Sequence, residues 1–181
     1  MTKTFDFGFG PVPAHRHPNG DGWVADSASV AESAWVERNA QVFGNAEVCD
    51  NARICGNAKV FGEARVSGDA EVFGNAQVFG EAQVSGDAWV FDNAEVSGKA
   101  RVYGDAWVFE KARVCGKARV TGRARVYGDA WVYGAARVYG KAEVYGKAEV
   151  YGKAEVYGKA EVYGDARVYG DAKIFEGDHH A

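Results

Sequence analysis

The chain lacks several features that would point to a membrane or to nucleic acid. It has no run of about 18 apolar residues, which a membrane-spanning helix requires. Its first residues do not follow the basic-then-apolar order of a secretion signal. The formal charge of −4 is mild, so nothing favours an anionic polymer as partner. We therefore expect a cytoplasmic protein with no membrane and no nucleic acid among its partners.

Cysteine is also scarce, and its placement argues against disulfides. The three cysteines, Cys49, Cys55 and Cys115, fall on three different sides of the repeat described below. A disulfide needs two Cα atoms within about 7 Å, which different sides of a coil do not offer. Free thiols are typical of a reducing compartment, which agrees with a cytoplasmic location.

What the chain does contain is a short, unbroken repeat. Val or Ile occupies every sixth position from Val24 to Ile174, and Ala occupies every sixth position from Ala28 to Ala172, over twenty-six consecutive hexads. A globular core needs apolar side chains of mixed size, whereas a single repeated size suits a narrow interior of constant cross-section. The repeat therefore predicts a solenoid.

Each hexad has the pattern of a short strand and a corner. Around each valine the order is Ala, polar residue, Val, and often an aromatic residue. This alternation of period two places Ala and Val on one face of a strand. In nineteen of the twenty-six hexads Gly follows two places after the aliphatic residue. Glycine followed by a polar residue marks a turn with unusual backbone angles.

A second period, of eighteen residues, predicts three hexads per coil. One column at this spacing contains only aromatic residues from Phe73 to Tyr163, and a corner column contains Asn39, Asn57, Asn75 and Asn93. Stacking of like on like favours a parallel β-solenoid with three sides. We predict an all-β fold, a single-stranded parallel β-helix of eight to nine coils, with a rod about 40 Å long. The predicted core includes Val60, Val66, Val72, Val78, Val84, Val90, Val96, Val102 and Val108.

The chain divides into three parts. Residues 1–22 contain all of the prolines and stand outside the repeat, so we expect an N-terminal arm that caps the first end of the rod. The β-helix is expected over residues 23–175, and residues 176–181 form a short C-terminal tail. Such a tail is too short for a closing helix, so we expect the C-terminal end to fray or to dock on another copy or a partner.

The hexads from Val24/Ala28 to Val168/Ala172 resemble those of the hexapeptide-repeat, left-handed parallel β-helix proteins. The resemblance implies a left-handed coil; the alternative is a right-handed triangular solenoid of the bactofilin type. Members of the hexapeptide family include acyltransferases and carbonic anhydrases, which use histidines on the coils at the seams of a trimer. This chain has no histidine from Trp23 to Phe175 and no loop between hexads. No catalytic residue and no cofactor is therefore carried over.

Polar residues offer two weak candidate sites. His15 and His17, with Asp21 and Asp26 nearby, could hold a metal such as Zn²⁺, although the interpretation that we prefer is a polar loop at the end of the rod and no metal site. Two polar columns lie on the rod, and for both we favour a solvated surface over a Ca²⁺ site or a stripe for an anionic polymer. The columns are Asp69, Asp87 and Asp105, and Arg65, Gln83, Arg101, Arg119 and Arg137.

The aromatic columns are the most informative surface. An outward apolar patch of this size is larger than most monomers leave in water, so we interpret it partly as stacking within the column and partly as burial against a second copy or a partner chain. The predicted interaction surface consists of Phe73, Trp89, Phe91, Trp107, Phe109, Tyr127, Tyr145 and Tyr163.

These observations predict a non-enzymatic structural rod that self-associates, or that binds a protein partner through the aromatic columns and its C-terminal end. One alternative is a trimeric hexapeptide-repeat acyltransferase. Another is a glycan- or ice-binding module, although ice binders of this fold present threonine ladders and only Thr121 lies on the rod.

Overall fold

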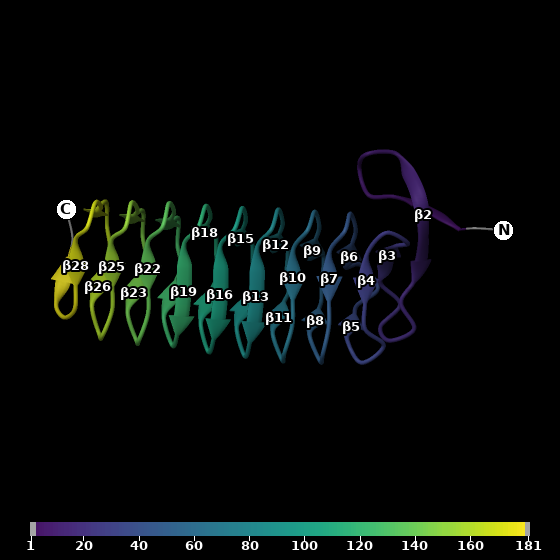
Figure 1. The fold of residues 1–181 in the computed structure, drawn as a ribbon, viewed down its shortest axis with the longest axis horizontal. Coiled ribbons are helices and arrows are strands. Elements are labelled where there is room, and N and C mark those ends of the chain that lie inside the picture. Colours follow the sequence, from purple (N-terminus) through teal and green to yellow (C-terminus); the bar gives the residue numbers. More distant parts are fainter. Residues whose placement is uncertain (1–2, 180–181) are drawn as a thin grey trace.

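The structure is a computed structural model that describes residues 3–179. It confirms the predicted triangular β-solenoid: about nine coils of 18 residues, formed by three sheets whose strands on the coils are all parallel. Figure 1 shows the coils side by side along one straight rod, with the first strands at one end and β28 at the other. No helix in this part of the chain is long and apolar enough to cross a membrane.

Successive strands belong to successive sheets, and each sheet therefore receives every third strand. The 11-stranded sheet contains, in spatial order, β1 (Thr4–Asp6), β2 (Pro11–Arg16), β3 (Trp23–Ala25), β6 (Gln41–Val42), β9 (Lys59–Val60), β12 (Gln77–Val78), β15 (Glu95–Val96), β18 (Arg113–Val114), β21 (Trp131–Val132), β24 (Glu149–Val150) and β27 (Arg167–Val168).

The two other sheets have nine strands each. The first contains β4 (Ser29–Val30), β7 (Glu47–Val48), β10 (Arg65–Val66), β13 (Gln83–Gly86), β16 (Arg101–Gly104), β19 (Arg119–Gly122), β22 (Arg137–Val138), β25 (Glu155–Val156) and β28 (Lys173–Ile174). The second contains β5 (Trp35–Val36), β8 (Arg53–Ile54), β11 (Glu71–Val72), β14 (Trp89–Val90), β17 (Trp107–Val108), β20 (Arg125–Val126), β23 (Glu143–Val144), β26 (Glu161–Val162) and β29 (Asp178–His179).

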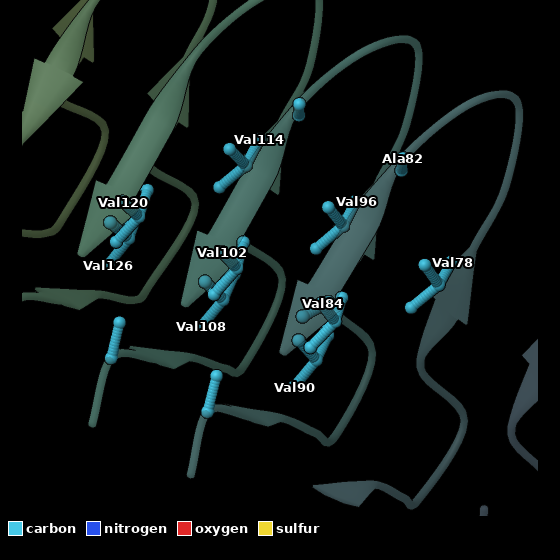
Figure 2. Close-up of a cluster of buried hydrophobic side chains, with 14 of the residues drawn as sticks. Val78, Ala82, Val84, Val90, Val96, Val102, Val108, Val114, Val120 and Val126 are labelled. Carbon is cyan, nitrogen blue, oxygen red and sulfur yellow. The ribbon is translucent and has the colours of Figure 1, made fainter. Parts of the chain in front are cut away.

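The interior is a column of valine and alanine. Strands pair in register at a separation of 18 residues, as in Val90 with Val108, so each valine stacks on the valine of the next coil. All nine valines of the predicted core, from Val60 to Val108, have no exposed surface. Figure 2 shows Val84 and Val90, which come from two different sheets, pointing into the same interior. Two sizes of side chain thus fill the whole cross-section.

Glycine is favoured at most corners because the coils approach one another closely there and the backbone adopts a positive φ. Gly152 has a φ of 72°, and a Cβ on it would lie 2.9 Å from the amide nitrogen of Gly170 in the next coil. An L-residue would therefore meet both an unfavourable backbone angle and a clash with main chain. Asp92 and Glu110 adopt the same left-handed φ, 58° and 57°, at one corner of two successive coils.

Residues 3–22 form a hairpin that lies on the first coil. Strands β1 and β2 pair antiparallel with each other, and β2 pairs antiparallel with β3 through Ala14 and Ala25. The hairpin stands at the N-terminal end of the rod in Figure 1. Phe7 packs against Phe43 in a small second cluster of buried residues. The all-parallel pattern of the coils therefore does not extend into this segment.

Residues 17–22 complete the hydrogen bonding of the first coil. The carbonyl of Val36 accepts from the amide of Gly22 at 2.8 Å, and the amide of Val36 donates to the carbonyl of Asn19 at 3.0 Å. The side-chain amide of Asn19 donates to the carbonyl of Ala34 at 3.1 Å. This segment satisfies the end of the sheet that begins with β5, where a preceding coil would otherwise lie.

At the other end the regular pairing continues into the predicted tail with one slip. Strand β29 pairs with β26, and His179 lies opposite Val162, a separation of 17 residues rather than 18. The last coil leaves part of its interior open, because Ala172 and Ile174 are only partly buried. Residues 180 and 181 of the predicted tail lie outside the described residues.

Candidate interaction surface

The longest aromatic ladder lies on the sheet that contains β11, β14 and β17. Each of its six rings directly follows a buried valine in the sequence and therefore faces outward. Consecutive ring centroids are 4.8 to 5.2 Å apart, and the ring planes differ by at most 10°. The rings are those of Phe73, Phe91, Phe109, Tyr127, Tyr145 and Tyr163. This is the strand spacing of a β-sheet, so the backbone pairing itself brings the rings into contact.

Two tryptophans broaden this ladder in its middle. Trp89 and Trp107 stack with centroids 5.1 Å apart and planes 4° apart. Each forms an edge-on contact with Phe91, at 81° and 76°. The guanidinium of Arg125 lies 5.0 Å from the centre of the Trp107 ring, a cation–π distance.

Stacking within the ladder covers part of its apolar surface. All eight residues of the predicted interaction surface are half-buried in the rod. Each ring covers the faces of the rings above and below it, so mainly ring edges meet the solvent. A partner on this ladder would therefore meet mainly ring edges. The more exposed rings lie elsewhere: Phe9, Trp35, Tyr103, Trp131, Tyr169 and Phe175.

Tyrosine hydroxyls add a hydrogen-bond ladder in the C-terminal half. The hydroxyl of Tyr127 donates to Glu143 at 3.0 Å, and that of Tyr145 donates to Glu161 at 3.0 Å. Tyr133 and Tyr139 make the same contact with the glutamate sixteen residues further on. Sixteen residues is two fewer than one coil. The tyrosine that follows a valine therefore reaches the glutamate that precedes the stacked valine of the next coil.

These contacts hold the phenols in their protonated form. Desolvation, then the hydrogen bond to Glu161 and the charge of that group, raise the pKa of Tyr145 to about 12. The same causes, with Glu143 as the acceptor, raise the pKa of Tyr127 further. A neutral phenol donates to a carboxylate, whereas a phenolate beside it would be repelled.

A second ladder runs on the 11-stranded sheet and includes the arm. Phe43, Phe61 and Phe79 stack at 4.8 and 5.0 Å. Phe7 of the arm stacks on Phe43 at 4.8 Å and thereby lengthens the ladder by one ring. The repeat did not predict this contact, because Phe7 lies outside it and the position of Phe7 depends on how the hairpin folds back.

The two histidines of the arm do not form a shared site. His15 Nδ1 lies 2.8 Å from Asp26, and both side chains are exposed. His17 is buried, and its Nε2 lies 3.2 Å from the carbonyl oxygen of Ala31. Its Nδ1 lies 3.0 Å from the carbonyl oxygen and 3.3 Å from the amide nitrogen of Asn19, so both ring nitrogens already have partners. Within residues 3–179 no three metal-binding side chains come together.

His17 therefore has a structural position that the sequence analysis did not predict. Its Nε2 faces the carbonyl oxygen of Ala31 at the end of the sheet that begins with β4. Together with β2 and Asn19, it brings the arm into contact with the ends of all three sheets.

The geometry of the ladders bears on the glycan-binding alternative. Sugars stack on the faces of aromatic rings, and here those faces are covered by neighbouring rings. Thr121, the threonine of the rod, follows Tyr103 and precedes Tyr139 in its column and so forms no threonine ladder. Neither arrangement favours a glycan or ice surface.

A hollow of about 420 Å³ lies along one corner of the rod. It is lined by Gly74, Asn75, Asp92, Asn93, Glu110, Lys111, Gly128 and Asp129. Its carboxylates and its lysine are exposed. The hollow follows the groove between stacked corners.

The comparison with known families agrees with the architecture. The family described as YdcK Beta solenoid repeat matches residues 118–134 and 124–140. These overlapping matches cover the region of β19 to β22 and support a repeat β-solenoid. No curated protein matches the chain.

Proposed function

We propose that the protein is a non-enzymatic structural rod that assembles with copies of itself or holds a protein partner. The observation that carries this proposal is the unbroken coil. From β3 to β28 each hexad is a strand and a corner, with no loop inserted between them. A surface of stacked ladders is suited to repeated contacts along its length rather than to one reaction centre.

Two surfaces support assembly. One is the aromatic ladder with Trp89 and Trp107, which offers ring edges along several coils. The other is the C-terminal end, where a hollow of about 380 Å³ is lined in part by Val168 and Ile174. Tyr169 and Phe175 beside it are 59% and 54% exposed. Strand edges and open apolar surface at the end of a sheet favour pairing with another chain.

The same proposal includes a left-handed coil, kinship with the hexapeptide-repeat proteins, and a cytoplasmic location without a membrane or nucleic acid as partner. The regular Val and Ala positions support the first two. The three free cysteines support the third, because Cys49, Cys55 and Cys115 adjoin strands of three different sheets.

Sedimentation velocity of the full chain over a wide range of concentrations tests the function. We expect species heavier than the 19.4 kDa monomer that grow with concentration. The variant Tyr169→Ser/Phe175→Ser should weaken assembly through the C-terminal end, and Thr4→Ser is a control on the exposed arm. A chain that stays monomeric at every concentration would refute self-assembly. A discrete trimer that binds an acyl-CoA would instead favour the acyltransferase alternative.

A further inference from the structure

Charge is segregated along one side of the rod. We call this side the polar face: the outward surface of the nine-stranded sheet from β4 to β28, with the corner before it and the corner after it. Along the corner before the sheet, the exposed residues are, in order, Ser27, Asn45, Glu63, Glu81, Lys99, Lys117, Ala135, Lys153 and Asp171. Along the corner after it, they are Asn51, Asp69, Asp87, Asp105, Arg123, Lys141 and Lys159. Both corners change from acidic to basic near the middle of the rod, and Asp171 reverses the sign of the first corner again in the last coil.

Within the chain, these corner charges are paired across the change of sign. Lys99 Nζ lies 3.0 Å from Glu81, and Arg123 Nε lies 3.6 Å from Asp105. Away from the change, like charges repeat in successive coils, which is unfavourable at strand spacing. In the part of the chain that the structure describes, these side chains form no ion pair within 4.0 Å: Glu63, Asp87, Lys117, Lys141, Lys153 and Lys159.

Side-chain size changes at the same place. In the outward column that follows the valines of this sheet, the first coils carry Ala31, Cys49, Ser67 and Ser85, and the later coils carry Tyr103, Thr121, Tyr139 and Tyr157. Tyr103, the first large residue, is 38% exposed. The corners of one half of the polar face are therefore mainly acidic, and its outward column has small side chains. The corners of the other half are mainly basic, and its outward column has mostly large side chains.

We propose that the polar face binds the polar face of a second copy of this chain, antiparallel, about a two-fold axis between the fourth and fifth coils (residues 77–94 and 95–112). This axis lies across the rods, so each corner meets the same corner of the partner in reverse order. The inference rests on the proposed self-assembling function, and it adds a third surface, with its geometry, to the aromatic ladder and the C-terminal end.

The antiparallel arrangement matches charge with opposite charge. In the first corner Glu81 meets the partner's Lys99, and Glu63 meets the partner's Lys117. The uncharged Asn45 meets the partner's Ala135. In the second corner Asp69 meets the partner's Arg123. Complementary charge of this kind fixes the register of an interface and speeds association.

The same register matches small side chains with large ones. Ser85 lies opposite the partner's Tyr103, and Cys49 lies opposite the partner's Tyr139. Two contacts join like charges, and in each a residue already has an ion pair in its own chain. Asp87 meets the partner's Asp105, which pairs with Arg123, and Arg65, which lies 3.2 Å from Glu47, meets the partner's Arg119.

Other arrangements of two copies lose this match. Parallel rods in register would place acidic half against acidic half and basic half against basic half. A nucleic acid would be attracted by one half of the face and repelled by the other. The area is also adequate: eight coils about 4.8 Å apart and a side of six residues give roughly 600 Å² per copy, or about 1,200 Å² in total, at the lower bound of specific interfaces.

Charge reversal with a rescue by mixing tests the pairing. The variants Glu63→Lys/Glu81→Lys and Lys99→Glu/Lys117→Glu should each weaken dimerisation by at least roughly tenfold in sedimentation, because opposed charges become alike. An equimolar mixture of the two should restore a heterodimer. The control Lys111→Glu/Lys147→Glu makes the same change of charge as Lys99→Glu/Lys117→Glu, but at exposed sites outside the polar face. It should dimerise like the original chain.

Cross-linking tests the orientation. In a Cys55→Ser/Cys115→Ser background, Tyr139→Cys should form a covalent dimer with a short bismaleimide, joining each Cys49 to residue 139 of the partner. Burial, and then the charge of Asp50, raise the pKa of the Cys49 thiol, so the reaction is run at about pH 8.5. Tyr133→Cys is the control, because this tyrosine follows β21 on the 11-stranded sheet and lies outside the polar face, and it should not cross-link.

The outcomes distinguish the polar-face dimer from the more general proposal of self-assembly. A full chain that is monomeric at low salt refutes the polar-face dimer and self-assembly together. A chain that assembles, but neither responds to charge reversal nor cross-links at residue 139, refutes the polar face and leaves the rod function in place. A dimer joined through Cys49 of both copies in the background chain would show parallel rods and overturn the antiparallel geometry.

Discussion

Replacement of Val108 by aspartate is expected to break the rod in its middle. Val108 has no exposed surface, and its strand β17 is held between β14 and β20. Removing a buried valine side chain costs about 1.5–3 kcal/mol of transfer free energy. A carboxyl group in its place has no donor in the Val and Ala interior, and an unpaired buried polar group adds several kcal/mol more.

The sum is comparable to the whole free energy of unfolding of a typical domain, about 5–15 kcal/mol. Because each coil contacts only its neighbours, the loss should not stay at one residue. We expect Val108→Asp to lose the cooperative urea transition seen by circular dichroism. Hydrogen exchange should show lost protection first in the coils of β14, β17 and β20.

A matched substitution distinguishes burial from a general effect of aspartate. Val168 is 7% exposed and lies in β27, the last strand of its sheet, where a carboxylate can reach water. Val168→Asp should therefore cost much less, about 1–3 kcal/mol, with fraying confined to the last coil. Equal urea midpoints for Val108→Asp and the original chain would refute the stacked interior as the source of stability.

Three further substitutions probe the corners, the tyrosine ladder and the arm. Gly152 and Gly170 share a left-handed φ, but only at Gly152 would a new Cβ meet the main chain of the next coil. Gly152→Ala should therefore lower the thermal midpoint more than Gly170→Ala. Equal shifts would contradict the close approach of the coils. The pKa of Tyr145 is raised to about 12, above its unfolded value, so the stability that this contact contributes is present below pH 10 and is lost as the pH rises toward 12. Ultraviolet titration should find a lower pKa in Glu161→Gln, and an unchanged value would exclude the carboxylate as a cause. His17→Ala leaves buried carbonyl and amide groups without their ring partners and should destabilise the chain by about 1–3 kcal/mol, with hydrogen-exchange protection lost in the first coil rather than the middle.

The core and the ladders could be predicted because each repeats. Any hexad carries its own strand and corner, and the eighteen-residue period places Phe73 on Phe91 without knowledge of the rest of the chain. Even the Tyr145–Glu161 contact was within reach, since a separation of one coil less two positions is a property of the sequence. Columns at a spacing of eighteen do not bring these two residues together, so they did not predict this contact.

The exposure of the candidate surface could not be predicted in the same way. Outward direction follows from alternation along a strand, but the surface that remains depends on how closely the rings stack. Phe91 and Trp107 are half-buried because stacked and edge-on neighbours cover them. The sequence therefore indicated which side chains face outward, whereas the surface that each of them leaves exposed depends on the stacking.

By itself, the sequence determined the coil: its strands, its corners, its three sides and the residues of its interior. It could do so because all of those contacts are local in a quasi-one-dimensional fold and recur at every step. Only the tertiary structure decided how the arm is used. Residues 3–22 have no repeat, so the antiparallel pairing of β2 and the burial of His17 depend on contacts with the first coil that no spacing within the arm specifies. The physical reason is that a repeat encodes its neighbours, whereas a cap is defined by the end that it covers.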